Sequence, residues 1–295
     1  MELLSPHWID YELIDSGGYE KLERFGAYIL ARPEPQACWN KSLDEAEWLR
    51  LAHVHFVREK GSNDKESEKG RWNFYKKMPE SWFVSYAYKE MKLKFRLGLT
   101  SFKHVGLFPE QADNWNFIHD TIVNSGNKMP RVLNLFAYTG GASIAAKASG
   151  ADVVHVDSVK QVISWSRENM EASGLDGIRW VVEDAMKFVR REVKRGSRYS
   201  GIILDPPAYG RGPDGERWIL EDSINELASL CAELLEPVNS FFILNLYSMG
   251  FSALVAENLA NSYFPNLKSK QYGELFFPDR SGNRLPLGIF LRFTR

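Results

Sequence analysis

Beginning at residue 131, the sequence repeats one local pattern, in which a short apolar strand is followed by a turn and by a helix with an apolar face. Strands that alternate with helices form a mostly parallel sheet with right-handed crossovers and helices on both faces. The sequence therefore predicts an α/β fold with a Rossmann-like sheet. The predicted strands cover 132–136, 153–156, 178–182, 200–204 and 240–246, and the predicted helices cover 142–149, 159–172, 185–194, 219–235 and 251–263.

The two ends of the chain differ from this central pattern. Residues 268–277 and 285–293 predict an antiparallel pair of strands, which brings the predicted sheet to seven strands. Before residue 100 the chain is aromatic, charged and rich in turns. We therefore expect a smaller β-rich substrate-recognition region over residues 1–100 and a cofactor-binding domain over residues 101–295. Residues 58–70 are nearly all polar and predict a mobile loop, because they cannot build a core.

Residues 82–88 and 91–99 predict two strands in the first region. In the second of them, apolar residues alternate with polar ones, which gives one buried face and one wet, basic face. Two interpretations stay open for that wet face. It is either a solvated strand edge protected by its charges or a ribbon that faces phosphate groups.

Composition narrows the range of functions. The chain has 44% apolar and 25% charged residues and a net charge of −1, so its overall charge provides no attraction for nucleic acid. Its two cysteines, Cys38 and Cys231, lie in no close cysteine–histidine cluster, so we expect neither a disulfide framework nor a metal site. The first residues lack a secretory pattern and no apolar run reaches about 20 residues, so we expect a cytoplasmic protein without a membrane segment.

Glycines, acids and prolines follow four of the predicted strands. The turn Thr139–Ser143 follows the first strand, Asp157 the second, Glu183 and Asp184 the third, and Asp205-Pro206-Pro207 the fourth. In an open α/β sheet the carboxyl ends of the strands meet at one edge, and ligands bind there. We therefore expect these segments to form a single site.

The glycine turn and the acid after the second strand each have a functional and a structural interpretation. Gly140 and Gly141 permit positive φ and close approach of a ligand, and the helix that follows presents unpaired N–H groups to a carboxylate. The alternative is a simple tight turn. Asp157 can accept hydrogen bonds from both hydroxyls of a ribose, or Asp157 or Ser158 can cap the next helix.

The Asp205-Pro206-Pro207 segment predicts a rigid tip, because proline fixes φ and removes a backbone donor. Two prolines can also simply end a strand. A nicotinamide-dinucleotide site is the competing interpretation of the whole edge. It requires Gly-x-Gly-x-x-Gly, whereas residues 139–143 read Thr-Gly-Gly-Ala-Ser, and an Asp-Pro-Pro tip has no role in hydride transfer.

With these motifs, residues from about 102 to 250 resemble the bacterial S-adenosylmethionine (SAM)-dependent methyltransferases related to the 23S ribosomal RNA large-subunit methyltransferases I and K. The segments 13–18, 21–26 and 32–37 are similar to a shorter branch of that group, which lacks a separate PUA-type RNA-binding domain. The resemblance implies a class I methyltransferase sheet, SAM as the cofactor, and RNA, in particular ribosomal RNA, as the substrate.

The resemblance also implies which residues bind SAM. In class I methyltransferases an acid after the third strand receives the adenine amino group, and here that acid is Asp184, or Glu183 if the strand ends one residue earlier. The family segment at 106–111 closes over SAM, which would place Gln111 and Phe108 in the pocket; the alternative is a strand-to-helix turn with a buried Phe108. The expected cofactor-binding residues are Phe108, Gln111, Asn134, Phe136, Ala137, Tyr138, Thr139, Gly140, Gly141, Ser143, Asp157, Ser158, Glu183, Asp184, Asp205 and Pro207.

The acceptor atom is predicted from a departure from the family pattern. Methylation of cytosine C5 requires a cysteine thiolate, and relatives with that chemistry carry a cysteine just after the fifth strand. Residues 244–250 contain none. Cys231 lies in an apolar pattern and is expected in the core. We therefore expect in-line methyl transfer to a nitrogen atom rather than the cysteine-dependent route.

Asp205, Pro206 and Tyr209 are the expected catalytic residues. Asp205 and the Pro206 carbonyl would orient an amine beside the sulfonium, and Tyr209, with Tyr247 opposite, would stack on a base. Orientation of two reactants can contribute up to about 7–11 kcal/mol, so no metal is required.

RNA binding is expected from local features. The basic residues after the third strand have two interpretations. They form either a solvated helix face or, together with the basic strand at 91–99, a phosphate-binding surface. Two other functions stay open, namely methylation of a protein or small molecule, and a module that binds SAM without turnover. The basic residues in question are Lys187, Arg190, Arg191, Lys194, Arg195 and Arg198.

Overall fold

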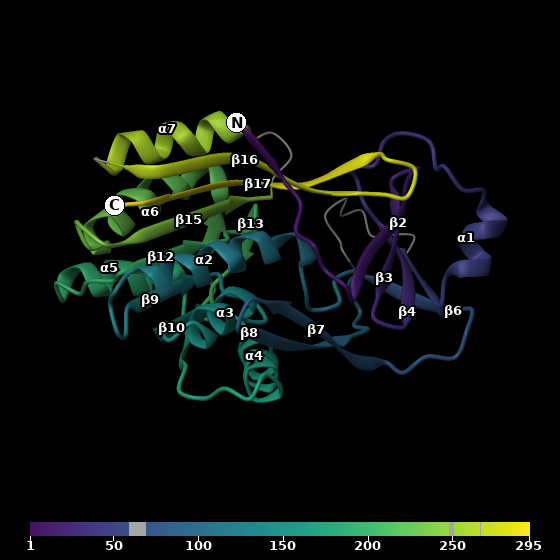
Figure 1. Cartoon of the computed structure of the whole chain (residues 1–295), viewed down its shortest axis with the longest axis horizontal. Coiled ribbons are helices and arrows are strands. Elements are labelled where there is room, and N and C mark those ends of the chain that lie inside the picture. Colours follow the sequence, from purple (N-terminus) through teal and green to yellow (C-terminus); the bar gives the residue numbers. More distant parts are fainter. Residues whose placement is uncertain (59–68, 248–250, 266) are drawn as a thin grey trace.

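The computed structural model describes residues 1–58, 69–247, 251–265 and 267–295. A central twisted sheet carries helices on both faces, and the β-rich first part of the chain lies beside it (Figure 1). Within the described residues the central sheet has eight strands, in the order β1-β16-β17-β15-β12-β9-β10-β11. They are β1 (Glu2–Leu4), β9 (Arg131–Leu135), β10 (Asp152–Asp157), β11 (Arg179–Val182), β12 (Gly201–Leu204), β15 (Phe241–Leu246), β16 (Lys268–Pro278) and β17 (Arg284–Thr294).

Parallel pairing dominates the centre of this sheet. The strands β15, β12, β9, β10 and β11 run parallel to one another, whereas β17 is antiparallel to both β15 and β16. The predicted α/β sheet with a C-terminal antiparallel pair is therefore confirmed. The prediction of seven strands missed β1, which pairs parallel with β16, because three residues are too few to show a period of two.

Helices cover both faces of the sheet, as predicted. On one face Trp115 and Ile144 share a core cluster with Val132. On the other face Leu227 shares a cluster with Leu133. Helix α2 was not predicted, because no motif marks its sequence. The helices of this part are α2 (Ala112–Asn124), α3 (Gly141–Ala148), α4 (Lys160–Ala172), α5 (Ala185–Lys194), α6 (Leu220–Leu234) and α7 (Ala253–Tyr263).

The N-terminal region is built around a second sheet, with the order β2-β3-β4-β5-β6. Its strands and helix are β2 (Tyr11–Gly17), β3 (Glu20–Phe25), β4 (Tyr28–Pro33), α1 (Glu45–Leu51), β5 (Val54–Arg58) and β6 (Gly70–Phe74), and β7 (Ser81–Tyr88) pairs with β8 (Met91–Gly98). The polar stretch predicted as a loop lies mostly outside the described residues; its two ends, Arg58 and Gly70, pair with each other in β5 and β6.

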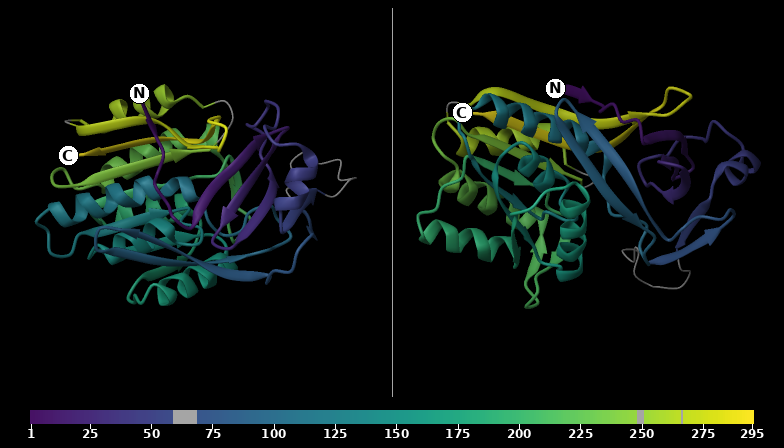
Figure 2. Two further views of the ribbon diagram at one scale, coloured as in Figure 1. Left: turned by 45° about the vertical axis from the view of Figure 1, so that its right-hand side comes forward. Right: turned by 60° about the horizontal axis from the view of Figure 1, so that its bottom comes forward.

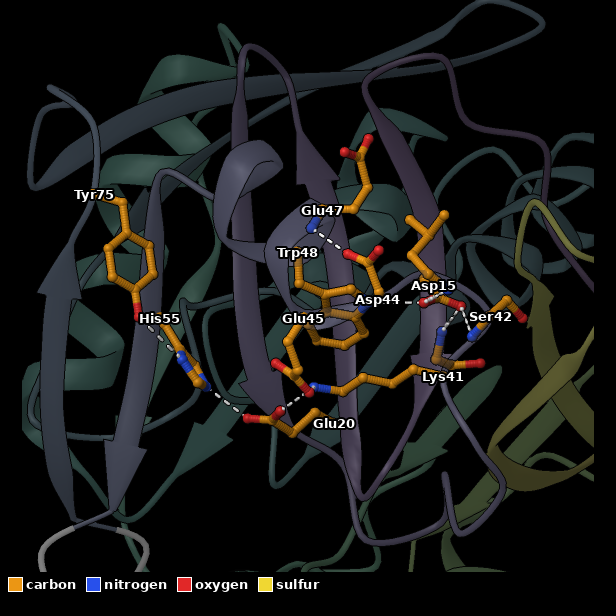
Figure 3. Close-up of polar contacts among 12 residues, drawn as sticks. Asp15, Glu20, Lys41, Ser42, Asp44, Glu45, Glu47, Trp48, His55 and Tyr75 are labelled. Carbon is orange, nitrogen blue, oxygen red and sulfur yellow. Dashed lines mark hydrogen bonds and ion pairs between the residues drawn. The ribbon is translucent and has the colours of Figure 1, made fainter.

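A chain of polar contacts attaches α1 and the segment before it to this second sheet (Figure 3). The Trp48 indole donates to Asp15 Oδ2 at 2.7 Å, and the Lys41 ammonium lies 3.8 Å from the Trp48 ring. Glu20 lies between two nitrogen groups, with Lys41 Nζ at 2.7 Å and His55 Nε2 at 2.6 Å. These contacts join β2, β3, β5 and α1 into one unit.

The two regions are joined by packed side chains. The β16–β17 hairpin extends from the central sheet to the N-terminal sheet (Figures 1 and 2). There Ser16 Oγ donates to Asp279 Oδ2 at 2.8 Å. The Trp8 and Trp115 rings lie 5.7 Å apart within one core cluster. The division predicted between residues 100 and 101 thus separates segments that share a core.

The edge of the basic strand β8 is covered by a helix. The Lys94 amide donates to Ser173 Oγ at 2.9 Å, and the Arg96 amide donates to Asn169 Oδ1 at 2.7 Å. The Trp165 indole donates to the Arg96 carbonyl at 2.9 Å. Side chains of α4 and of the residue that follows it therefore satisfy backbone groups that a strand edge otherwise leaves unpaired.

Candidate functional site

A cavity lies at the carboxyl ends of β9 and β12, at the sheet edge where the sequence predicts a ligand site. The predicted residues on its wall are Phe108, Gln111, Asn134, Phe136, Ala137, Tyr138, Thr139, Gly140, Gly141 and Asp205. The wall also contains Leu107, Trp115, Ala142, Ile203 and Asn245, which were not predicted. These additional residues are mostly apolar or lie on elements, such as α2, that carry no motif.

The β9–α3 loop is strained and firmly held. Phe136, Tyr138 and Gly140 have φ values of 55°, 48° and 89°, and such left-handed conformations cost non-glycine residues about 1–3 kcal/mol each. The Ser166 hydroxyl donates to the Tyr138 carbonyl at 2.7 Å, and the Asn169 amide group donates to the Thr139 carbonyl at 3.0 Å. These bonds fix the loop so that α3 begins beside the cavity, with the unpaired N–H groups of its first turn.

Asp157 supports the same loop from the end of β10. Its Oδ2 accepts the Tyr138 amide and its Oδ1 accepts the Val159 amide, both at 2.9 Å. Burial raises the pKa of Asp157, and these backbone N–H groups oppose the shift. A carboxylate oxygen can accept a second bond, so the structural role leaves acceptor capacity for a ribose. Ser158 follows it, half-buried.

The two acids after β11 have partners of their own. Asp184 is the N-cap of α5 and accepts the Lys187 amide at 2.9 Å. Glu183 forms an ion pair with Arg191. Neither acid is on the wall of the cavity, and the expected contact of Asp184 or Glu183 with adenine stays a prediction.

The tip after β12 places one carboxyl group at the cavity. Asp205 is on the wall, and burial raises its pKa to about 7. Pro206 is buried, and the Pro207 carbonyl accepts the Trp218 indole at 2.7 Å. Tyr209 is 47% exposed and lies away from the cavity wall, on β13 (Tyr209–Arg211), which pairs with β14 (Arg217–Ile219). The sequence did not predict this small hairpin.

A buried polar layer lies beneath the loop. Ser143 Oγ accepts the Asn134 amide group at 2.9 Å and lies 3.0 Å from His155 Nδ1. Burial lowers the pKa of His155 to about 3, so the imidazole is neutral. Ser143 is fully buried and supports the loop rather than lining the cavity. His155 was predicted only as a strand residue, because a histidine among valines gives no functional signal.

The described residues offer neither a metal site nor a membrane-spanning helix. No group of three or more His, Cys, Asp or Glu side chains in that part of the chain could hold a metal ion. None of the helices that the structure describes is both long enough and apolar enough to cross a membrane.

Residues 76–264 match the family described as S-adenosylmethionine-dependent methyltransferase. The crystal structure of the SAM-dependent methyltransferase from Agrobacterium tumefaciens is 35% identical to this chain, with a TM-score of 0.88 over 100% of this chain and 93% of that one. The structure of aTrm5 with tRNALeu has a TM-score of 0.52 over 97% of this chain and 72% of that one; at 12% identity this likeness concerns the fold alone.

Curated relatives agree with the resemblance seen in the sequence. The ribosomal RNA large subunit methyltransferase K/L of Shewanella baltica (strain OS195) is 33% identical over 161 residues, which are 53% of this chain and 21% of that protein. The corresponding protein of Shewanella sp. (strain MR-4) is 31% identical over 179 residues, 59% of this chain and 24% of that protein. The chain thus spans less than a quarter of the length of these relatives.

Proposed function

Because the chain belongs to the S-adenosylmethionine-dependent methyltransferase family, we propose that it transfers a methyl group to a nitrogen atom of RNA, with ribosomal RNA as the acceptor. The observation that carries the nitrogen assignment is the Asp205 carboxyl group, held at the cavity wall on a proline-stiffened tip. RNA is favoured by the curated relatives, which are named as ribosomal RNA methyltransferases. A ribosomal RNA acceptor agrees with the cytoplasmic location that we expect from the sequence.

The cavity fits SAM, which supplies an electrophilic methyl group on a sulfonium. A Cβ atom on Gly141 would lie 2.6 Å from the Trp115 ring, so the cradle requires glycine there. The Phe108 and Tyr138 rings lie 5.4 Å apart at the cavity, and aromatic faces attract cations. We infer that the first turn of α3 binds the carboxylate of SAM, that Asp157 binds the ribose and that Asp184 binds adenine.

The chemistry of the acceptor follows from the side chains at the tip. Asp205 and the Pro206 carbonyl can accept N–H bonds and so orient an amine. Tyr247 lies near the cavity, with its ring 5.9 Å from Phe108, whereas Tyr209 would have to turn inward to stack on a base.

A cysteine-dependent route lacks its thiol among the residues that the structure describes. Cys231 is fully buried in α6, and burial raises the pKa of its thiol. Cys38 is exposed in the N-terminal region, and no cysteine is on the described wall of the cavity. Residues 248–250 lie outside the described residues, but none of them is a cysteine.

The basic helix α5 supports RNA binding less strongly than its composition suggests. Most of its cations have acidic partners: Lys187 with Asp214 at 2.9 Å, Arg190 with Glu226 at 2.6 Å, Arg195 with Glu192 at 2.9 Å, and Arg191 with Glu183. Lys194 and Arg198 are exposed at its exit. The interpretation as a solvated helix face therefore gains weight, and any phosphate contact at this surface is a local one.

Tritium transfer identifies the acceptor. The protein is incubated with methyl-tritiated SAM and with the RNA, protein and metabolite fractions of cells that lack it. We expect label in ribosomal RNA, on a nitrogen atom after nuclease digestion and chromatography. Label in protein or metabolites, or on carbon, contradicts the proposal.

A further inference from the structure

Glu110 is a buried carboxyl group without an evident structural role. It lies in the 3-10 turn Pro109–Gln111, directly before Gln111 of the cavity wall, and it is 2% exposed. Its Oε1 has no hydrogen-bond partner among the described residues. Burying a polar group without a partner is costly, so such groups are rare and require an explanation.

The charges that act on Glu110 locate it between the N-terminal sheet and the tip after β12. Lys21 and Glu23 act from β3 and Asp205 acts from the tip. The charge of Glu110 also contributes to the raised pKa of Tyr11 in β2 and of Tyr247 after β15. Burial raises the pKa of Glu110 to about 7, and the charges of Glu23 and Asp205 add to the rise, while Lys21 and a backbone N–H oppose it.

The neighbouring ions do not need Glu110 as a partner. Lys21 Nζ lies 3.1 Å from Glu34 Oε2, and Arg32 Nη2 lies 2.6 Å from Glu23 Oε2. The Tyr11 hydroxyl donates to Glu23 Oε1 at 2.7 Å. Glu110 is thus a further carboxyl group beside this cluster, and its buried Oε1 without a partner among the described residues is best explained by a ligand.

We propose that Glu110 accepts the proton that the acceptor nitrogen releases, and that the acceptor is consequently an amine bearing N–H bonds, such as the exocyclic amino group of a nucleobase. This inference rests on the proposed function. A ring nitrogen that attacks with a free lone pair and carries no proton would need no such base.

The proposed step balances. The nitrogen lone pair forms the new N–C bond, and the C–S bond breaks with its electron pair left on sulfur. The nitrogen, now positively charged, loses one N–H proton to Oε1 of the Glu110 carboxylate, which passes it to solvent. A base is most effective when its pKa lies near the working pH, and the environment of Glu110 provides this.

The test replaces Glu110 by glutamine, which keeps the shape of the side chain but cannot take the proton. We expect E110Q to bind SAM within about twofold of the wild type by calorimetry and to transfer methyl groups to ribosomal RNA about 10²-fold more slowly at pH 8. The rise of the wild-type rate with pH up to about 7 should become shallower in the variant. The methylated product should be a secondary amine.

Thermal unfolding provides a readout that is independent of transfer. A carboxyl group whose pKa is higher in the folded than in the unfolded state destabilises the fold as pH rises between the two values. The Tm of E110Q should therefore rise relative to the wild type between pH 4.5 and 7.5. The buried Glu192, on α5 and away from the cavity, provides the control E192Q, which should keep the wild-type transfer rate.

Four results would overturn the assignment of Glu110: an unchanged rate in E110Q, an unchanged pH profile, a Tm difference that does not vary with pH, or a methyl group on a nitrogen that carried no proton. Label in the protein or metabolite fraction would contradict the RNA proposal instead. The transfer rates of E110Q and the wild type on that labelled fraction would then show whether Glu110 acts as the base. No transfer to any fraction would contradict both.

Discussion

The cavity edge and the charged cluster of the N-terminal sheet lie side by side but are built in opposite ways. At the edge, short loops follow the parallel strands. The cavity there is shaped mainly by the backbone conformation of these loops and by their backbone N–H groups. The cluster consists of four charged side chains and one tyrosine that bind one another through ion pairs and hydrogen bonds. They come from β2, β3, β4 and the residue after β4, and they are Tyr11, Lys21, Glu23, Arg32 and Glu34. A site built on the backbone can be read from local motifs, whereas a buried ion cluster cannot.

The two constructions should also fail differently. Loss of a side chain at the cavity edge should impair binding or transfer and leave the fold intact. Loss of one ion from the cluster leaves its partner charged and buried, which is strongly destabilising. Substitutions in each region can therefore separate chemistry from stability.

Asp205→Ala should have the largest effect on the chemistry. Removal of the orienting carboxyl group should lower methyl transfer by about 10³-fold, or about 4 kcal/mol of barrier. SAM binding by calorimetry should change by less than about threefold. Asp214→Ala, which removes an exposed carboxyl group from the nearby β13–β14 hairpin, is the control and should retain full transfer. Equal turnover by the Asp205 variant would remove the catalytic assignment.

Arg32→Met should have the largest effect on the fold. It leaves Glu23, which is fully buried, without the guanidinium at 2.6 Å, and breaking such a pair costs about 3–5 kcal/mol. Urea unfolding should detect this loss. Arg190→Met, which breaks an exposed pair with Glu226, should cost less than about 1 kcal/mol. Similar losses in the two variants would show that the cluster behaves like a surface ion pair.

The sequence was informative where function depends on a strand and the turn that follows it. The strand–helix alternation, the glycine turn and Asp205 were all readable, because each is a local pattern with a defined place at the sheet edge. Helix α2 and the cavity residues Trp115 and Asn245 were not, since only tertiary packing brings them to the wall. The same holds for Glu110, because the charges of Lys21 and Glu23 that act on it lie nearly 90 residues earlier in the chain.

His155 sharpens the comparison, because it is a buried ionisable group at the otherwise backbone-built edge. Its pKa is about 3 in the folded protein and about 6.5 when unfolded, so the unfolded state binds the proton first and stability falls as the pH drops below about 6.5. At pH 5 this amounts to about 2 kcal/mol. Other buried groups, such as Glu110, gain stability over the same pH range in both proteins. Between pH 7 and pH 5 the stability of the wild type, from urea unfolding, should therefore fall by about 2 kcal/mol relative to that of His155→Gln. An unchanged difference between the two proteins would mean that the imidazole does not titrate this way.

Gly140→Ala should have the smallest effect and tests whether the backbone of the loop is itself the binding element. The glycine has a φ of 89°, and an added Cβ would lie 3.3 Å from the Ser166 Cβ, so alanine should cost about 1–2 kcal/mol of stability. Gly126 also has a positive φ, 70°, but nothing lies within 4 Å of its Cβ position. Both alanine variants should therefore lose stability by strain, while only Gly140→Ala should weaken SAM binding, by about tenfold in calorimetry. If both variants bind SAM equally well, the loop shape does not determine affinity, and the cavity edge depends on its side chains as the charged cluster does.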